Sequence, residues 1–240
     1  MVVPAERIEG PAAPLNGGMI RAVTFDAGHT LIEPRESVGE VYAAVAAQHG
    51  ATDLPAGELE RRFHAASHAR GSAVSRREDW ARIVDDTFAG LLAIPPSKTF
   101  FPELFERFGR APAWRIYADV QPTLEMLARR GARLGVISNW DDRLRPLLAE
   151  LHLAGWFEVI VISCEVGCAK PAPGIFAAAA QAFGLPPAEI LHVGDNWQAD
   201  VAGARAAGFQ AMQIPRDLAP GPDRIDRLVE LRHRLEQGKE

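Results

Sequence analysis

Polar residues that could do chemistry follow four apolar runs of this chain, at the point where each run ends. They are Asp26, Ser138 with Asn139, Ser163 with Lys170 close behind it, and Asp195 after Gly194. If the runs are buried parallel strands, their carboxyl ends meet at one edge of a sheet, which is where open α/β sheets bind ligands. We therefore expect these side chains to form one active-site mouth.

Asp26 is the candidate nucleophile at this mouth. A carboxylate can attack an electrophile when a cation and hydrogen-bond donors offset the charge around it. The ammonium group of Lys170 is the candidate cation. Ser138 and Asn139 would add a hydroxyl, an amide and backbone N–H groups at the entrance of a helix, where anions bind favourably.

A second acidic group, the pair Asp195 and Asp200, stands five residues apart across a predicted strand-to-helix turn. A turn of that length can direct both carboxylates at one hard cation. Mg²⁺ suits them, because it usually takes one or two protein carboxylates and completes its shell with waters and phosphate oxygens. Without a cation, three aspartates beside a phosphate dianion would repel one another strongly. The expected cofactor is therefore Mg²⁺.

Each of these residues also has a plain structural explanation when it is taken alone. An aspartate after a strand is often a turn residue, and a serine often caps the next helix. A lysine before a proline is usually solvated. Only the ordered combination, at successive strand ends, predicts a function.

Alternating strand and helix patterns indicate the fold class. Five short apolar runs predict buried parallel strands at residues 20–25, 133–137, 159–162, 190–193 and 211–214. Helical patterns follow at residues 122–130, 142–151, 174–183, 198–207 and 223–237. This alternation predicts an α/β fold with a doubly wound parallel sheet, since right-handed crossovers place helices on both faces.

One long segment, residues 34–116, interrupts the alternation with no convincing strand. Helical patterns fill it at residues 37–49, 57–69, 78–92 and 97–108. They predict an all-helical insert directly after the Asp26 loop, either a lid that excludes water or a rigid bundle. The predicted domains are a flexible tail at 1–18, a core at 19–33 and 117–240, and the helical insert at 34–116.

Composition excludes several classes of protein. A net charge of −5 argues against a nucleic-acid surface. The two cysteines, Cys164 and Cys168, are too few for a disulfide framework and fit small packed side chains. The sequence has no run of about 20 apolar residues, the length needed to span a bilayer. It also lacks the apolar central region that is typical of a signal peptide. We expect a cytoplasmic protein that binds neither nucleic acid nor membrane; the sequence indicates no oligomeric state.

From Ile20 onward the chain resembles the haloacid dehalogenase-like (HAD) hydrolases in four ordered motifs. Residues 25–31 look like the first motif, with Asp26 as its aspartate, and residues 136–139 look like the second. Residues 170–176 look like the third, and residues 192–208 look like the metal-binding fourth. The helical insert is similar to the family's C1-type cap. The resemblance thus implies a Rossmann-like HAD core with an inserted cap.

What the resemblance implies for function is hydrolysis of a small phosphorylated molecule through an aspartyl-phosphate. Asp26 would attack phosphorus while Lys170, Ser138 and Asn139 hold the phosphoryl oxygens. The groups that would bind Mg²⁺ are Asp26, Asp195, Asp200 and the backbone carbonyl of Gly28.

Gly28 departs from the phosphatase pattern, which has a second aspartate two residues after the nucleophile. That aspartate protonates the leaving group and later activates water. Loss of a general acid–base group typically costs about 10²–10⁴-fold in rate. Acyl and aryl phosphates should suffer least in the first step, because their leaving groups need no proton.

Three explanations for Gly28 are open. His29 could act as acid and base, although strand-like alternation would turn it the other way. A residue of the insert could supply the group, and the candidates are His64, His68, Arg76 and Arg77. Alternatively, the protein is a pseudoenzyme that binds a ligand or partner. A weak or substrate-restricted Mg²⁺-dependent phosphatase is the preferred interpretation.

A metal-independent 2-haloacid dehalogenase is the alternative enzyme. Those family members also lack the second aspartate and also have the Ser138–Asn139 pair. They usually have tyrosine where Gly28 stands, and retention of both Asp195 and Asp200 argues against them. Trp140 and Trp197 stand near the mouth and could line a substrate pocket, but tryptophan there more often serves packing.

Overall fold

The centre of the protein is a five-stranded parallel sheet, seen here in a computed structural model that describes residues 20–71, 76–216 and 224–237. Its strands are β1 (Ala22–Phe25), β4 (Arg133–Ser138), β5 (Val159–Ile162), β6 (Ile190–Gly194) and β7 (Gln210–Gln213). They lie in the order β5-β4-β1-β6-β7, with β1 in the middle. All five predicted strands are confirmed, and so is the α/β fold class.

The strand register brings the carboxyl ends of the central strands level with one another. Phe25 at the end of β1 pairs with Val136 of β4 on one side and with Val193 of β6 on the other. The residues that follow these strands therefore leave the sheet at one edge. The side chains of β1 are fully buried, as expected for a strand covered on both faces.

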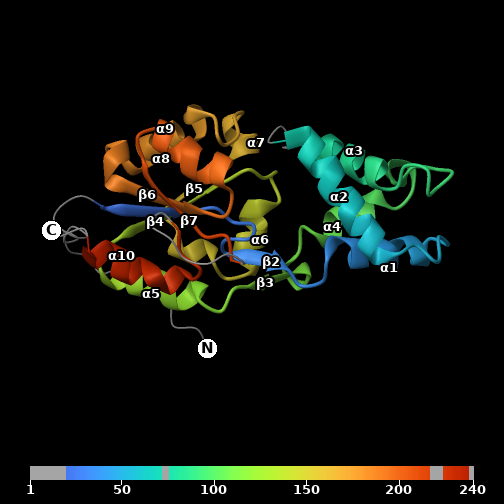
Figure 1. Ribbon diagram of the computed structural model, residues 1–240, viewed down its shortest axis with the longest axis horizontal. Coiled ribbons are helices and arrows are strands. Elements are labelled where there is room, and N and C mark those ends of the chain that lie inside the picture. The colour runs from blue at the N-terminus through green and yellow to red at the C-terminus, as the bar shows by residue number, and fades with distance from the viewer. Residues whose placement is uncertain (1–19, 72–75, 217–223, 238–240) are drawn as a thin grey trace.

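Helices cover both faces of the sheet (Figure 1). One face packs against α5 (Val120–Arg129), α6 (Leu144–Glu150) and α10 (Leu231–Gln237), and the other against α8 (Pro173–Phe183) and α9 (Gly203–Ala206). The short elements of this part are η4 (Ala154–Trp156), α7 (Ser163–Val166), η5 (Pro187–Glu189) and η7 (Leu228–Glu230). Apolar residues spaced to form one face of each helix supply the two cores.

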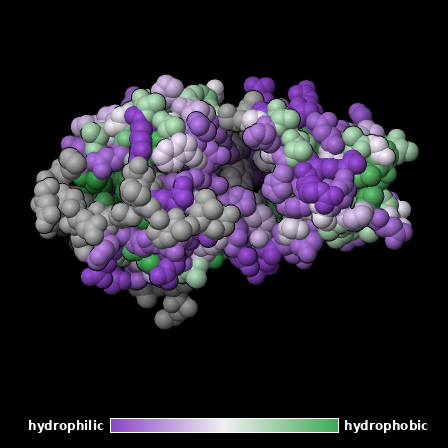
Figure 2. Space-filling view, in the orientation of Figure 1, coloured by the Kyte–Doolittle hydropathy of each residue, from purple (hydrophilic) through white to green (hydrophobic). Residues whose placement is uncertain are grey.

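Four further helices form a separate layer, which we call the helical bundle. They are α1 (Val38–Gln48), α2 (Ala56–Arg70), α3 (Arg77–Thr87) and α4 (Phe101–Arg107), with η2 (Pro96–Lys98) before α4. Aromatic side chains dominate their shared core. Figure 1 shows the bundle beside the sheet, and Figure 2 shows a hollow between the two parts. The division into tail, core and insert stays a prediction.

A two-stranded antiparallel ribbon lies between the sheet and the bundle. It pairs β2 (Ile32–Pro34) with β3 (Trp114–Ile116), which follows η3 (Ala111–Ala113). The expectation that no strand precedes Tyr117 in the insert region was wrong. Each strand is three residues long, and the partners are some eighty residues apart in sequence, so no local pattern reveals the pairing.

Two predicted helices have a different form in the structure. The helix predicted at 198–207 is a π-helix, η6 (Trp197–Ala202), that continues into α9. The helix predicted at 223–237 begins only at Leu228, and residue 223 lies outside the described residues, as does the predicted tail at 1–18. Within the described part of the chain, no helix is long and apolar enough to cross a membrane.

Candidate active site

Asp26 leaves the sheet directly after β1, and its carboxylate receives two hydrogen bonds from neighbouring strand ends. The Ser138 hydroxyl donates to Asp26 Oδ1 at 2.8 Å, and Lys170 Nζ donates to the same oxygen at 2.7 Å. No described residue donates to the second oxygen, Oδ2, through its side chain. The carboxylate is therefore fixed through one oxygen, while the other can meet a ligand.

Lys170 is a buried charge of the site, with 2% of its side chain exposed, as is its partner Asp200. Besides Asp26, its ammonium group donates to Asp200 Oδ1 at 2.6 Å and to the backbone oxygen of Ile137 at 2.8 Å. Burial by itself lowers the pKa of Lys170, but the charges of Asp200 and Asp26 outweigh it and raise the pKa above its usual value. The group therefore stays cationic.

Asp26, Asp195 and Asp200 form the acidic cluster that the sequence predicts at this edge. One carboxylate oxygen of each lies within 4.8 Å of the others. Burial, together with the charges of Asp26 and Asp200, raises the pKa of Asp195 to about 8. A single ammonium group thus does not balance three carboxylates, and a divalent cation would. The donor set, all oxygen, fits Mg²⁺.

Asp200 is held in place by more contacts than the sequence indicated. Its Oδ1 accepts from Lys170 and lies 3.2 Å from His192 Nε2, and its Oδ2 accepts from the backbone N–H of Asn196 at 2.9 Å. Burial alone would raise the pKa of Asp200, but Lys170 and His192 hold it below its usual value. A Cβ at Gly194 would lie 2.2 Å from Asp200 Cγ, so this close approach requires glycine.

His192 is a site residue to which the sequence reasoning gave no role. It lies in β6 with no exposed surface, and its Nδ1 is 3.0 Å from the Thr24 hydroxyl. Burial lowers its pKa, which favours the neutral ring. A proton on Nε2 then points to Asp200, while Nδ1 accepts from Thr24. A histidine inside an otherwise apolar strand was the signal that could have identified it.

Asn139 and Ser163 contact the loops around the site. The Asn139 amide donates to the backbone oxygen of Lys170 at 2.9 Å and accepts from the Lys170 N–H at 2.7 Å. The Ser163 hydroxyl donates to the Trp140 oxygen at 3.0 Å and accepts from the Trp140 N–H at 3.1 Å. Asn139 thus ties the loop after β4 to the loop that carries Lys170, and Ser163 ties it to the start of α7.

Gly28 lies under the indole of Trp140. A Cβ at Gly28 would be 3.3 Å from Trp140 Cζ3, so the tryptophan partly fills the space that a side chain at residue 28 would take. The neighbouring His29 has a positive φ of 52° and is exposed, and its backbone N–H donates to Ile32. No described residue accepts a hydrogen bond from its ring.

The other predicted candidates for the acid–base role lie on the bundle. His64 contacts Glu60 at 3.0 Å, and the guanidinium of Arg77 stacks over Phe101 and Phe105. His68 and Arg76 are exposed. Among the described residues, no hydrogen bond joins any of these four to Asp26 or its neighbours.

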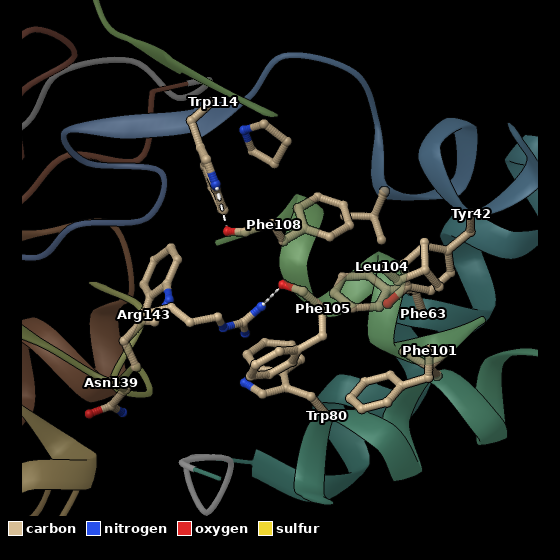
Figure 3. Close-up of a pocket in the computed structure, with 14 residues that line it drawn as sticks. Tyr42, Phe63, Trp80, Phe101, Leu104, Phe105, Phe108, Trp114, Asn139 and Arg143 are labelled. Carbon is tan, nitrogen blue, oxygen red and sulfur yellow. Dashed lines mark hydrogen bonds between the residues drawn. The ribbon is translucent and has the colours of Figure 1, made fainter. Parts of the chain in front are cut away.

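A cavity of about 180 Å³ lies between the bundle, the ribbon and the loop after β4 (Figure 3). Its walls are mostly aromatic rings, among them Tyr42, Trp80 and Phe105 from the bundle. Asn139 and Trp140, which follow Ser138 at the end of β4, line it as well. Of the two tryptophans expected near the mouth, Trp140 lines this cavity and Trp197 is 43% exposed outside it.

Comparison with known proteins gives relatives along most of the chain. The family model of haloacid dehalogenase-like hydrolases matches residues 20–208. The haloacid dehalogenase-like hydrolase domain-containing protein 3 of Mus musculus is 34% identical over 208 residues, which are 81% of this chain and 82% of the mouse protein. A phosphoserine phosphatase of Thermus thermophilus is 41% identical over 49% of this chain and 48% of its own.

Solved structures agree with the sequence relatives. An HAD phosphatase from Thermococcus onnurineus superposes with a TM-score of 0.65 at 27% identity, over 90% of this chain and 98% of its own. A 2-haloacid dehalogenase from Pseudomonas syringae has the same TM-score and identity, over 90% and 97%. The two share one fold but differ in named activity. The motifs, the sheet and these matches together show that this chain is a hydrolase of the haloacid dehalogenase-like family.

Proposed function

We propose that the protein is a Mg²⁺-dependent phosphatase that hydrolyses a small phosphorylated molecule through an aspartyl-phosphate. The excess of carboxylate over ammonium charge at the site carries this proposal, because three carboxylates within 4.8 Å of one another call for a divalent cation. Two relatives named as phosphatases support it.

The first step is attack on phosphorus by Asp26. The oxygen Oδ2 forms the new P–O bond, and the bond to the leaving oxygen breaks as its electron pair departs with that oxygen. Lys170 and Ser138, which already donate to Oδ1, keep the carboxylate aimed and offset its charge. The second step is attack of water on the acyl phosphate, which releases inorganic phosphate and restores Asp26.

Asp26, Asp195, Asp200 and the Gly28 carbonyl would hold the metal. Bound Mg²⁺ supplies charge neutralisation at the phosphoryl oxygens. His192 and the Asn196 N–H would orient Asp200 toward it. Asn139 would act mainly by fixing the Lys170 loop, since both ends of its amide are engaged there. The helical bundle would serve as the cap that limits access of water.

Gly28 makes the proposed reaction selective for its leaving group. No described side chain near Asp26 replaces the missing carboxylic acid, and Trp140 lies over the position. The absence of a general acid costs about 10²–10⁴-fold with alkyl leaving groups. Substrates whose leaving group departs as an anion escape most of that loss in the first step.

Dehalogenation is the second candidate, because a 2-haloacid dehalogenase is as similar in fold as the phosphatase. In that reaction Asp26 would attack carbon and displace halide. Halide release in the presence of a chelator would favour this candidate. Failure to release either phosphate or halide would favour a ligand-binding pseudoenzyme.

The deciding experiment is phosphate release from alkyl, aryl and acyl phosphates, with Mg²⁺ and with chelator. We expect turnover only with metal and none in Asp26→Asn, which serves as the control for contaminating phosphatases. Metal-independent turnover, or turnover retained in Asp26→Asn, would contradict the proposal.

A further inference from the structure

The cavity between bundle and sheet has walls suited to an uncharged ring. Aromatic side chains surround it in Figure 3, with Phe63 and Phe101 deep on the bundle side and Trp114 on the ribbon side. Its volume, about 180 Å³, exceeds the roughly 150 Å³ of an apolar cavity that takes up benzene. One substituted six-membered ring therefore fits.

The single charged residue of the cavity wall is already neutralised. Arg143 donates to both oxygens of Asp141, at 2.8 and 2.6 Å, and to the backbone oxygen of Phe105 at 2.5 Å. Its guanidinium also lies 3.5 Å from the centre of the Phe105 ring. Among the described residues that line the cavity, none offers a free charge to a carboxylate or an ammonium group of a ligand.

One fully buried polar atom of the wall lacks a partner among the described residues. The indole N–H of Trp80 is buried, and no described residue accepts its hydrogen bond. A second of the three wall indoles, that of Trp114, donates to the Phe108 oxygen at 3.0 Å. An unsatisfied buried donor is costly, and a ligand with one acceptor atom would relieve it.

The cavity adjoins the catalytic groups through the two residues that follow Ser138. Trp140 lines the cavity on one side and lies over Gly28 on the other, and Asn139 next to it follows Ser138. A phosphoryl group beside Asp26 would therefore place its leaving group toward the cavity. This is also the place where the absence of an acid favours a leaving group that departs without a proton.

We propose that the cavity receives the leaving group of the substrate, and that this group is a single uncharged aromatic ring with one hydrogen-bond acceptor directed at Trp80. This inference rests on the proposed function and names its substrate class: aryl and arylmethyl phosphate monoesters. A phenolic leaving group, with a pKa of about 10, departs more readily than an alcohol. Phosphoserine, with charged groups on its leaving side, would find no partner in the wall.

The test separates recognition of the ring by the cavity from the chemical reactivity of the leaving group. Benzyl phosphate and isobutyl phosphate both release an alcohol, so a difference between them reports on the cavity. We expect kcat/KM to be at least tenfold higher for benzyl phosphate and higher again for phenyl phosphate, with phosphoserine the poorest. Equal rates for the benzyl and isobutyl esters would overturn the inference.

Variants at Trp80 test the wall directly. Trp80→Ala should abolish the preference for benzyl over isobutyl phosphate, chiefly through KM. Trp80→Phe keeps the ring and should remove only the preference for 4-methoxybenzyl over 4-ethylbenzyl phosphate, which differ in one acceptor. Trp156→Phe, at a half-buried tryptophan outside the cavity, is the matched control and should change neither preference. Unchanged preferences in Trp80→Ala would contradict the assignment.

A binding measurement distinguishes failure of this inference from failure of the phosphatase proposal. Calorimetry with benzylphosphonate and isobutylphosphonate, in the presence of Mg²⁺, needs no turnover. Tighter binding of the benzyl compound that is lost in Trp80→Ala would support the cavity assignment even in a protein without phosphatase activity. Phosphatase activity without any preference for the ring would leave the function standing and overturn the cavity assignment.

Discussion

The acidic cluster and the aromatic cavity lie next to each other but differ in how their side chains are held in place. In the cluster the buried charges are held by several hydrogen bonds each: Lys170 uses three acceptors, and Asp200 is contacted through both oxygens. In the cavity, rings from separate helices define a shape, and one N–H has no described acceptor. The first region holds charges in place through direct hydrogen bonds, whereas the second would select a ligand by size and polarity.

This difference indicates which kinds of substitution each of the two regions should tolerate. Removing one member of the cluster leaves a buried charge without its counterpart, which costs several kcal/mol. Removing a ring from the cavity wall only enlarges an apolar cavity that already exists. Substitutions in the cluster should therefore affect chemistry and folding together, and substitutions in the cavity should affect selectivity.

The largest effect should come from the nucleophile. Asp26→Asn removes the attacking oxygen, and kcat should fall by about 10⁴-fold or more, a size seen when a nucleophile is removed. The measurement is phosphate release from phenyl phosphate with Mg²⁺. The exposed Asp142→Asn, also a strand-end loop carboxylate, is the control and should keep its rate. Retention of a tenth of the activity by Asp26→Asn would break the covalent mechanism.

The next effect should be on stability. Lys170→Met leaves Asp26 and Asp200 without their shared cation, so the free energy of unfolding should drop by about 3–5 kcal/mol. Urea denaturation without metal measures it. Lys98→Met, at an exposed lysine of the bundle, should change stability by less than about 0.5 kcal/mol. Equal stability of the two variants would show that the cluster is not held by its buried charges.

A third variant tests the boundary between the two regions. Gly28→Asp alone should help little, because its Cβ would lie 3.3 Å from Trp140, closer than an ordinary van der Waals contact. Combined with Trp140→Phe, which frees part of that space, it should raise kcat for isobutyl phosphate by about 10–10²-fold, within the range of general acid–base catalysis. Trp140→Phe alone is the control. A gain in the control equal to that in the double variant would place the effect in the cavity instead.

The smallest effect concerns pH. The pKa of Asp195 is raised to about 8 in the folded protein from 3.8, so between these values the folded state binds the additional proton. Stability then falls as pH rises, by up to about 1.4 kcal/mol per pH unit. Urea denaturation of the metal-free protein at pH 5, 6 and 7 measures the slope. Asp195→Asn should have a flatter profile, and matching slopes would contradict the raised pKa.

The position of the acidic cluster could be predicted from the sequence because its members follow strands. Asp26, Ser138 and Asp195 each come directly after an apolar run, and the parallel register brings those ends level. Short-range patterns therefore determine which residues meet. The engagement of Asn139 with the Lys170 peptide was not foreseen, because it depends on the path of two loops.

The cavity could not be predicted in the same way. Its rings come from α1, α2, α3, α4 and the ribbon, and no spacing in the sequence tells which faces of separate helices turn toward each other. The aromatic residues at Trp80 and Phe105 are typical of any helical core. The ribbon that holds Trp114 was itself missed, since its strands pair only through tertiary contact.

The π-helix η6 has a consequence for how this protein can change through insertions and deletions. Asp200 lies in η6 and Asp195 stands two residues before it begins, and one carboxylate oxygen of each lies within 4.8 Å of the other. Each residue of an α-helix turns the next by about 100°. Deletion of one exposed residue between β6 and Asp200, such as Gln198, would rotate Asp200 by one helical position and swing it away from its partners while the sheet stayed intact. A natural or engineered deletion could thus inactivate the cluster without changing any of its side chains.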